Sequence, residues 1–72
     1  MTKINYSIKN ASLVTLKVYD VSGREILVLV NEFQNFGRYS VNFNGSNFAS
    51  GIYYYKIFAR DFESFRKMLL LK

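Results

Sequence analysis

The chain has 72 residues, contains no cysteine and no histidine, and carries ten Lys and Arg against five Asp and Glu, for a formal net charge of +5. The missing residue types exclude disulfides, Cys/His metal sites and Ser-His-Asp triads, and a chain of this length forms one domain with a thin margin of stability. The basic residues are spread along the chain, with Arg66-Lys67 the only adjacent pair, which favours a solvated surface over a nucleic-acid footprint.

The first part of the chain alternates apolar and polar residues with a period of two, as half-buried strands do. Residues 2–8 (TKINYSI) and 38–43 (RYSVNF) show this pattern most clearly, and Val14, Leu16 and Val18 share one face of a further strand. The stretch GREILVLVNEF at 23–33 is ambiguous because its apolar run also suits a short helix. Its length and its two valines favour a strand.

Turn residues separate these runs. Gly23 closes an Asp-Val-Ser-Gly turn, Gly37 precedes residues 38–43, Gly45 lies in an Asn-Gly-Ser-Asn turn, and Gly51 follows Ser50. We expect all four glycines to be structural, and Gly51 to adopt a positive φ. Strands start at intervals of roughly ten to twelve residues, the pattern of a small all-β sandwich or barrel. The sequence contains no linker or repeat, so residues 1–72 are predicted to form a single domain.

The stretch GIYYYKIF at 51–58 raises a question because both faces of the predicted strand are apolar. Alternation separates two sets of side chains, which are Tyr53, Tyr55 and Ile57 against Ile52, Tyr54 and Phe58. One set must face outward, and residues 65–71 repeat the surplus. A contiguous exposed apolar patch usually marks an interaction site. The alternatives are that a neighbouring domain or loop covers the surplus, or that some tyrosines lie flat with their hydroxyls in water.

The remaining polar residues do not indicate a catalytic site. The carboxylates are Asp20, Glu25, Glu32, Asp61 and Glu63, and a chain this small rarely forms the cleft that a paired-carboxylate site requires. The glycines fit no phosphate-binding pattern, and the RNA-recognition signature is missing. We therefore predict no enzyme activity, no cofactor, no metal, no small-molecule substrate and no nucleic-acid partner.

Targeting signals are also missing from the sequence. No apolar run approaches the ~20 residues of a membrane helix, and the first ten residues lack the apolar central region of a signal peptide. Two interpretations are open at this point: a cytoplasmic protein, or a domain excised from a longer secreted chain. Composition alone does not choose between them.

Four blocks of sequence carry a resemblance to a known family. In chain order they are TKINYSI at 2–8, LVTLKVYDVSGREI at 13–26, GRYSVNFNG and SGIYYYK at 37–56, and KMLLLK at 67–72. Together they resemble the C-terminal sorting domain of the type IX secretion system (type A), found on secreted and surface proteins of Bacteroidetes and related bacteria. Each block is weak alone, but the set is specific and covers the chain from Thr2 to Lys72.

The chain departs from that family in one respect and shares part of its pattern with another domain. Members usually carry a Pro-rich segment just before the opening block, and Met1 stands in its place here. This suggests that the chain was cut from its parent at the linker. The Ig-like domain of the flagellar hook-capping protein shares the middle blocks, so the closing KMLLLK block decides in favour of the sorting domain.

The resemblance implies a small Ig-like antiparallel β-sandwich of about seven strands, which catalyses nothing and acts as the address of a cargo domain fused covalently upstream. The implied partners are the type IX translocon and the outer-membrane shuttle and sortase components. The implied localisation is secreted or cell surface, after passage through the periplasm of a Gram-negative bacterium.

We hypothesise that the hairpin of strands 52–58 and 65–71, turned at residues 60–63, is the recognition surface. The residues expected to make contact are Tyr54, Lys56, Phe58, Lys67, Leu69, Leu71 and Lys72. An edge strand there could also pair with a partner's backbone. The alternative function is a passive Ig-like module of a secreted enzyme, either a spacer or a carbohydrate binder. A third is a small basic nucleic-acid-binding domain, whose affinity would fall steeply with salt.

Overall fold

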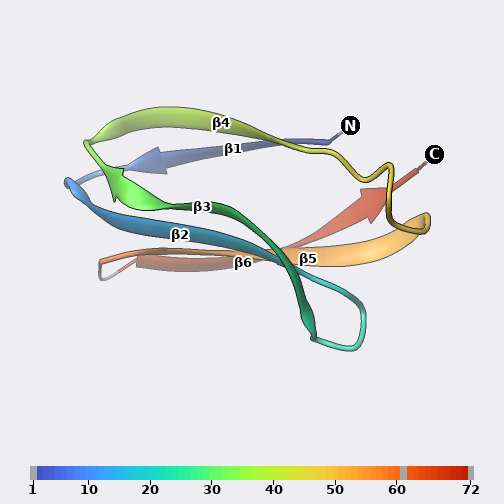
Figure 1. Ribbon diagram of the computed structural model, residues 1–72. Coiled ribbons are helices and arrows are strands. Elements are labelled where there is room, and N and C mark those ends of the chain that lie inside the picture. The colour runs from blue at the N-terminus through green and yellow to red at the C-terminus, as the bar shows by residue number, and fades with distance from the viewer. Residues whose placement is uncertain (1, 61, 72) are drawn as a thin grey trace.

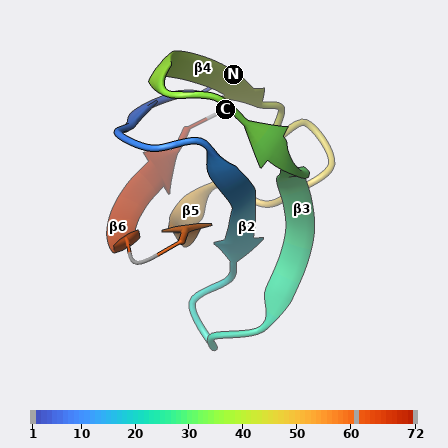
Figure 2. The ribbon, with the colours of Figure 1, turned by 90° about the vertical axis from the view of Figure 1, so that its left-hand side faces the viewer.

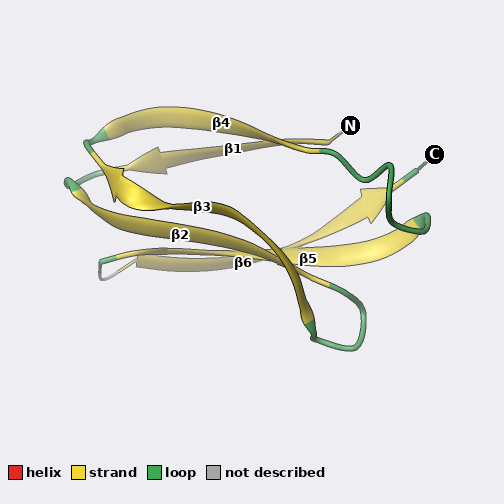
Figure 3. Ribbon diagram, viewed as in Figure 1, coloured by secondary structure: helices red, strands yellow, loops and turns green. Residues whose placement is uncertain are grey.

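The computed structural model describes residues 2–60 and 62–71, and every element in this part of the chain is a strand or a loop (Figures 1 and 3). The strands are β1 (Thr2–Ile8), β2 (Ser12–Tyr19), β3 (Glu25–Gln34), β4 (Gly37–Phe43), β5 (Gly51–Ala59) and β6 (Phe62–Leu70). All pairings are antiparallel, in a two-stranded sheet β1-β4 and a four-stranded sheet of order β3-β2-β5-β6. The predicted antiparallel β-sandwich is confirmed, with six strands in the described residues where about seven were expected.

The two sheets pack face to face and enclose a single core (Figure 2). Val14, Leu16 and Val18 of β2 are completely buried, on the one face that the alternation predicts. The other buried apolar residues are Ile4, Ile8, Val30, Phe43, Tyr53, Ile57, Ala59 and Leu70. A two-stranded sheet is marginally stable at best in water. The β1-β4 sheet therefore depends on this shared core for its stability.

The ambiguous run at residues 26–30 lies within β3, so the strand prediction is confirmed. The β2-β3 register shifts twice, and β3 carries the extra residues. At a bulge two residues oppose one, which breaks the strict alternation of faces. Ile26, Leu27 and Leu29 are consequently all packed partly against the core, beside the buried Val30. A continuous apolar run is thus compatible with a bulged edge strand.

The β5-β6 hairpin is tighter than the sequence predicts. Phe62 already pairs with Ala59, so the strands predicted at 52–58 and 65–71 instead run at 51–59 and 62–70, and residues 62 and 63 of the predicted turn belong to β6. Arg60 has a φ of 59°, in the left-handed region that two-residue hairpin turns use. Asp61 lies outside the described residues.

Gly45 acts through close packing. A Cβ placed on this residue would lie 2.5 Å from both Cδ atoms of Leu70, the last residue of β6. Real Cβ atoms do not approach other atoms so closely, so a side chain at position 45 would displace Leu70 from the core. Gly45 thus allows the loop between β4 and β5 to contact the end of β6.

Gly51 opens β5 with a φ of 149°, which L side chains rarely adopt. We expect Gly51→Val to lower the free energy of unfolding by more than about 1 kcal/mol, although no atom crowds the Cβ position. Thermal melting measures the effect, and Ile52→Val in the same strand is the control. An unchanged melting temperature for Gly51→Val would contradict the strained backbone.

The two ends of the sandwich differ in what they carry. β1 begins and β6 ends at one end, together with the β2-β3 turn and the β4-β5 loop (Figure 1). The β1-β2, β3-β4 and β5-β6 turns lie at the opposite end, which we call the turn end.

The two sheets are joined near the turn end by the Tyr6 hydroxyl, which donates a 2.8 Å hydrogen bond to Gln34 Oε1. Burial raises the pKa of the Tyr6 phenol.

Candidate recognition surface

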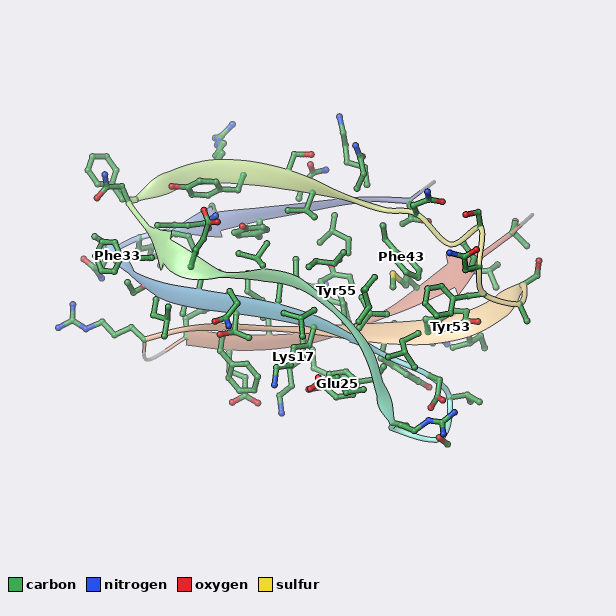
Figure 4. All side chains as sticks on the ribbon, viewed as in Figure 1. Lys17, Glu25, Phe33, Phe43, Tyr53 and Tyr55 are labelled. Atoms are coloured by element: carbon green, nitrogen blue, oxygen red, sulfur yellow. The ribbon has the colours of Figure 1, made fainter. Side chains whose placement is uncertain are left out.

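The four-stranded sheet has one side turned away from β1 and β4, which we call the outer face. Figure 4 shows Lys17 and Glu25 on this side, and Phe43 and Tyr55 between the sheets. The register places alternate residues of three strands on the outer face. They are Leu13, Thr15, Lys17 and Tyr19 of β2, Ile52, Tyr54, Lys56 and Phe58 of β5, and Glu63, Phe65, Lys67 and Leu69 of β6.

The two faces of the tyrosine strand are now distinguished. Tyr53 is buried, and its ring lies at an edge-on angle 6.1 Å from that of Phe43. Its hydroxyl donates a 2.6 Å hydrogen bond to the carbonyl oxygen of Ala49. Tyr54 points outward and its ring stacks on that of Phe65, with 5.2 Å between the centroids. The apolar surplus is therefore an exposed aromatic surface.

Charges on the outer face are mostly paired across strands. Lys17 Nζ lies 3.0 Å from Glu25 Oε1, and Lys56 Nζ lies 3.0 Å from Glu63 Oε1. The hydrogen bond that the Lys17 ammonium donates to the Glu25 carboxylate raises the pKa of Lys17. Among the described residues, no carboxylate pairs with Lys67. Lys67 is therefore the charge on this face that a partner's carboxylate meets without breaking an existing pair.

A shallow groove of about 480 Å³ separates the aromatic rings from the β2-β3 turn. Tyr19, Tyr54 and Phe65 line it on the side of the sheet, and Val21 lines it on the side of the turn. The turn is held by Asp20 Oδ1, which accepts hydrogen bonds from the Ser22 hydroxyl at 2.6 Å, the Ser22 N–H at 2.9 Å and the Arg24 N–H at 3.0 Å. The Ser22 hydroxyl bond is the largest contribution that lowers the pKa of the Asp20 carboxyl.

The residues singled out in the sequence fall into three groups. Tyr54, Lys56, Phe58, Lys67 and Leu69 lie together on the outer face. Leu71 follows β6 and is exposed, and Lys72 lies outside the described residues. The sequence reasoning missed Tyr19 and Phe65, which complete the aromatic surface. Their position on the same face as Tyr54 could have been found only by aligning the three strands in register.

The surface offers binding chemistry. In residues 2–60 and 62–71 no group of three or more His, Cys, Asp or Glu side chains is placed to hold a metal ion. No helix in that part of the chain is long and apolar enough to cross a membrane. Exposed rings, together with an ammonium group and a strand edge that have no partner among the residues the structure describes, can bind a protein surface or an extended peptide.

The fold is that of a small all-β sandwich, and one face of its larger sheet is lined by aromatic side chains. A family model described as the secretion system C-terminal sorting domain matches residues 1–71. The chain belongs to this family and is a C-terminal sorting domain of type IX secretion cargo, a non-catalytic sorting signal. Neither a curated protein nor a solved structure matches it. The assignment favours sorting over the passive accessory module, and it implies an interaction with the secretion machinery and a secreted or surface-bound cargo.

Proposed function

We propose that the type IX translocon recognises this domain on the outer face of the β5-β6 hairpin. The proposed contact residues are Tyr54, Lys56, Phe58, Lys67, Leu69, Leu71 and Lys72. The domain directs a cargo, linked covalently upstream of β1, from the periplasm through the outer membrane to the cell surface or the medium. An outer-membrane shuttle and a sortase are the further proposed partners.

The free edge of β6 is the observation that best supports this proposal. Within the described residues β6 pairs with β5 alone, so one side of its backbone is available to another strand. Charged side chains discourage such pairing, and β6 carries Glu63, Arg66 and Lys67 in its first part but no charge at 68–70. The last part of β6 is therefore best suited to β-augmentation by an extended partner segment.

Apolar side chains flank this part of the edge. Leu69 pairs with Ile52 in register, and both are exposed, as is Leu71 beyond the end of β6. Exposed apolar groups that are contiguous usually mark an interaction site. Lys67 lies beside these apolar groups, and an apolar centre bordered by polar groups is the arrangement that protein interfaces commonly have.

The position of β1 keeps this surface accessible when a cargo is attached. β1 belongs to the other sheet, although it begins at the end of the sandwich where β6 finishes (Figure 1). A cargo linked upstream of β1 therefore enters next to the closing block but on the opposite layer. The outer face remains free for a partner.

The proposal is tested by fusing the chain behind a foreign reporter that is targeted to the periplasm, in a bacterium with type IX machinery. The reporter is expected at the cell surface or in the medium, because the address lies in this domain. Surface protease accessibility and reporter activity in the medium measure export, and the same fusion in a translocon-deficient strain is the control. Retention of a folded fusion in the periplasm of the competent strain would contradict the proposal.

A further inference from the structure

The turn end carries a group of four exposed large apolar side chains. One lies in the β3-β4 turn and the others lie within two residues of a strand end, and they are Leu13, Phe33, Phe36 and Phe62. Leu13 and Phe33 are direct partners in the β2-β3 register, and Figure 4 shows Phe33 at this end of the molecule. Scattered single apolar residues need no explanation, but a group of them at one end does.

Phe36 is the most exposed member of this group. It occupies the β3-β4 turn, where Gly, Asn, Asp and Ser are the residues that stabilise the backbone. The turn is fixed by the Tyr39 hydroxyl, which donates a 2.7 Å hydrogen bond to the carbonyl oxygen of Asn35. The fold thus holds a large ring at the tip of a hairpin, 74% exposed.

Three cationic residues lie at the same end of the molecule as these apolar side chains. A hollow of about 290 Å³ opens between the β1-β2 and β5-β6 turns, and it is lined by the buried Ile8 and Ala59 together with Phe62, Lys9 and Arg60. Arg38 is the second residue of β4, next to Gly37.

Among the described residues, no carboxylate forms an ion pair with any of these three cations. Glu32 lies two residues before Gln34 in β3, opposite Val14, and is therefore further from the turn end than Gln34. Asp61 lies outside the described residues.

We propose that the turn end docks on an anionic lipid surface, with Phe33, Phe36 and Phe62 entering the headgroup region and Lys9, Arg38 and Arg60 meeting the phosphates. Exposed aromatic groups beside cations are the combination that binds membrane interfaces. The chain's net charge of +5 has the matching sign. β1 begins and β6 ends at the opposite end of the sandwich, so a cargo linked upstream of β1 would not block the contact. The inference does not depend on the outer face being read by the translocon.

The test uses the purified chain and sedimentation with vesicles. The chain is expected to bind vesicles of phosphatidylcholine mixed with phosphatidylglycerol more strongly than vesicles of phosphatidylcholine alone. This binding is expected to weaken as the salt concentration increases. Phe33→Ser with Phe36→Ser is expected to lower the partition coefficient at least about tenfold. Arg60→Gln and Lys9→Gln are each expected to lower it about fivefold.

Two controls separate this end from the rest of the surface. Val21→Ser changes a residue that is as exposed as Phe36, at 75%, but lies in the β2-β3 turn at the opposite end. Lys3→Gln removes one positive charge from β1, far from the turn end along that strand. Both variants are expected to bind like the unmodified chain. Equal losses for the controls and the turn-end variants would overturn the proposal, because they would show non-specific attraction.

A gain of signal avoids reliance on variants that fail to fold. The chain contains no tryptophan, so Phe36→Trp introduces a single reporter at the turn end, and Val21→Trp introduces one at the opposite end. Anionic vesicles are expected to shift the emission of the first to shorter wavelength and to leave the second unchanged. No binding to anionic vesicles, or a shift for both reporters, would overturn the proposal, and the first result would leave a protein partner as the occupant of this end.

Discussion

Tyr53→Ser is expected to lower the free energy of unfolding by about 3 kcal/mol or more, whereas Tyr54→Ser should leave it nearly unchanged. Tyr53 is 9% exposed, and its ring contacts those of Phe43 and Phe48 in the core. Serine would leave a cavity and remove the bond to Ala49. The ring of Tyr54 packs on the outer face against Phe65 and is partly solvated.

The size of the domain makes the Tyr53 effect easy to measure. At about 0.05 to 0.15 kcal/mol per residue, a domain of this length has only about 4 to 11 kcal/mol of stability. Denaturant unfolding measures the loss, and Tyr53→Phe is the matched control. It keeps the ring and is expected to cost about 1 kcal/mol for the lost hydrogen bond. Tyr55 lies on the inner face but is only partly buried. The stability cost of Tyr55→Ser is therefore expected to lie between those of Tyr53→Ser and Tyr54→Ser. Equal costs at all three positions would contradict the division into faces.

Strand alternation predicted the core of the sheets but not the details of their edges. Val14, Leu16 and Val18 are buried because period-two patterning leaves a strand one way to bury its apolar face. The double bulge in β3 was not predictable, because it depends on how residues 26–30 meet β2 and the core together. The tight β5-β6 turn was missed for a related reason. Arginine and aspartate at 60–61 carry no strong signal for a two-residue turn.

The outward face of the tyrosine strand could not be assigned from the sequence. Its two faces are almost equally apolar, so hydrophobicity gives no preference between them. The choice is made by pairing partners: β2 and β6 lie on either side of β5, and their own core residues fix the face that β5 must share. The groove beside Tyr54 also requires Val21 from the β2-β3 turn. Such a contact depends on the three-dimensional path of the chain.

Replacing Lys67, Leu69 and Leu71 with Glu, Ser and Ser is expected to reduce reporter export at least about tenfold, since a few residues usually carry most of an interface's binding energy. Leu69 and Leu71 are exposed, and no carboxylate of the described residues pairs with Lys67. The variant should therefore fold. A single surface substitution usually changes stability by no more than about 0.5 kcal/mol, or about 4 °C in melting temperature, so the three together are expected to shift it by no more than about 12 °C.

Substitution is more informative than truncation at this strand. Removing residues 67–72 would also remove Leu70, which is buried and contacts the loop at Gly45, so lost export would then reflect unfolding. Val28→Ser is the matched control: Val28 is 44% exposed at the opposite edge of the sheet, against 58% for Leu69. If the control is exported at the unmodified level and the β6 variant fails although it still folds, recognition lies on the β6 edge. Normal export of the folded β6 variant would make the closing strand structural and move the recognition surface elsewhere on the domain.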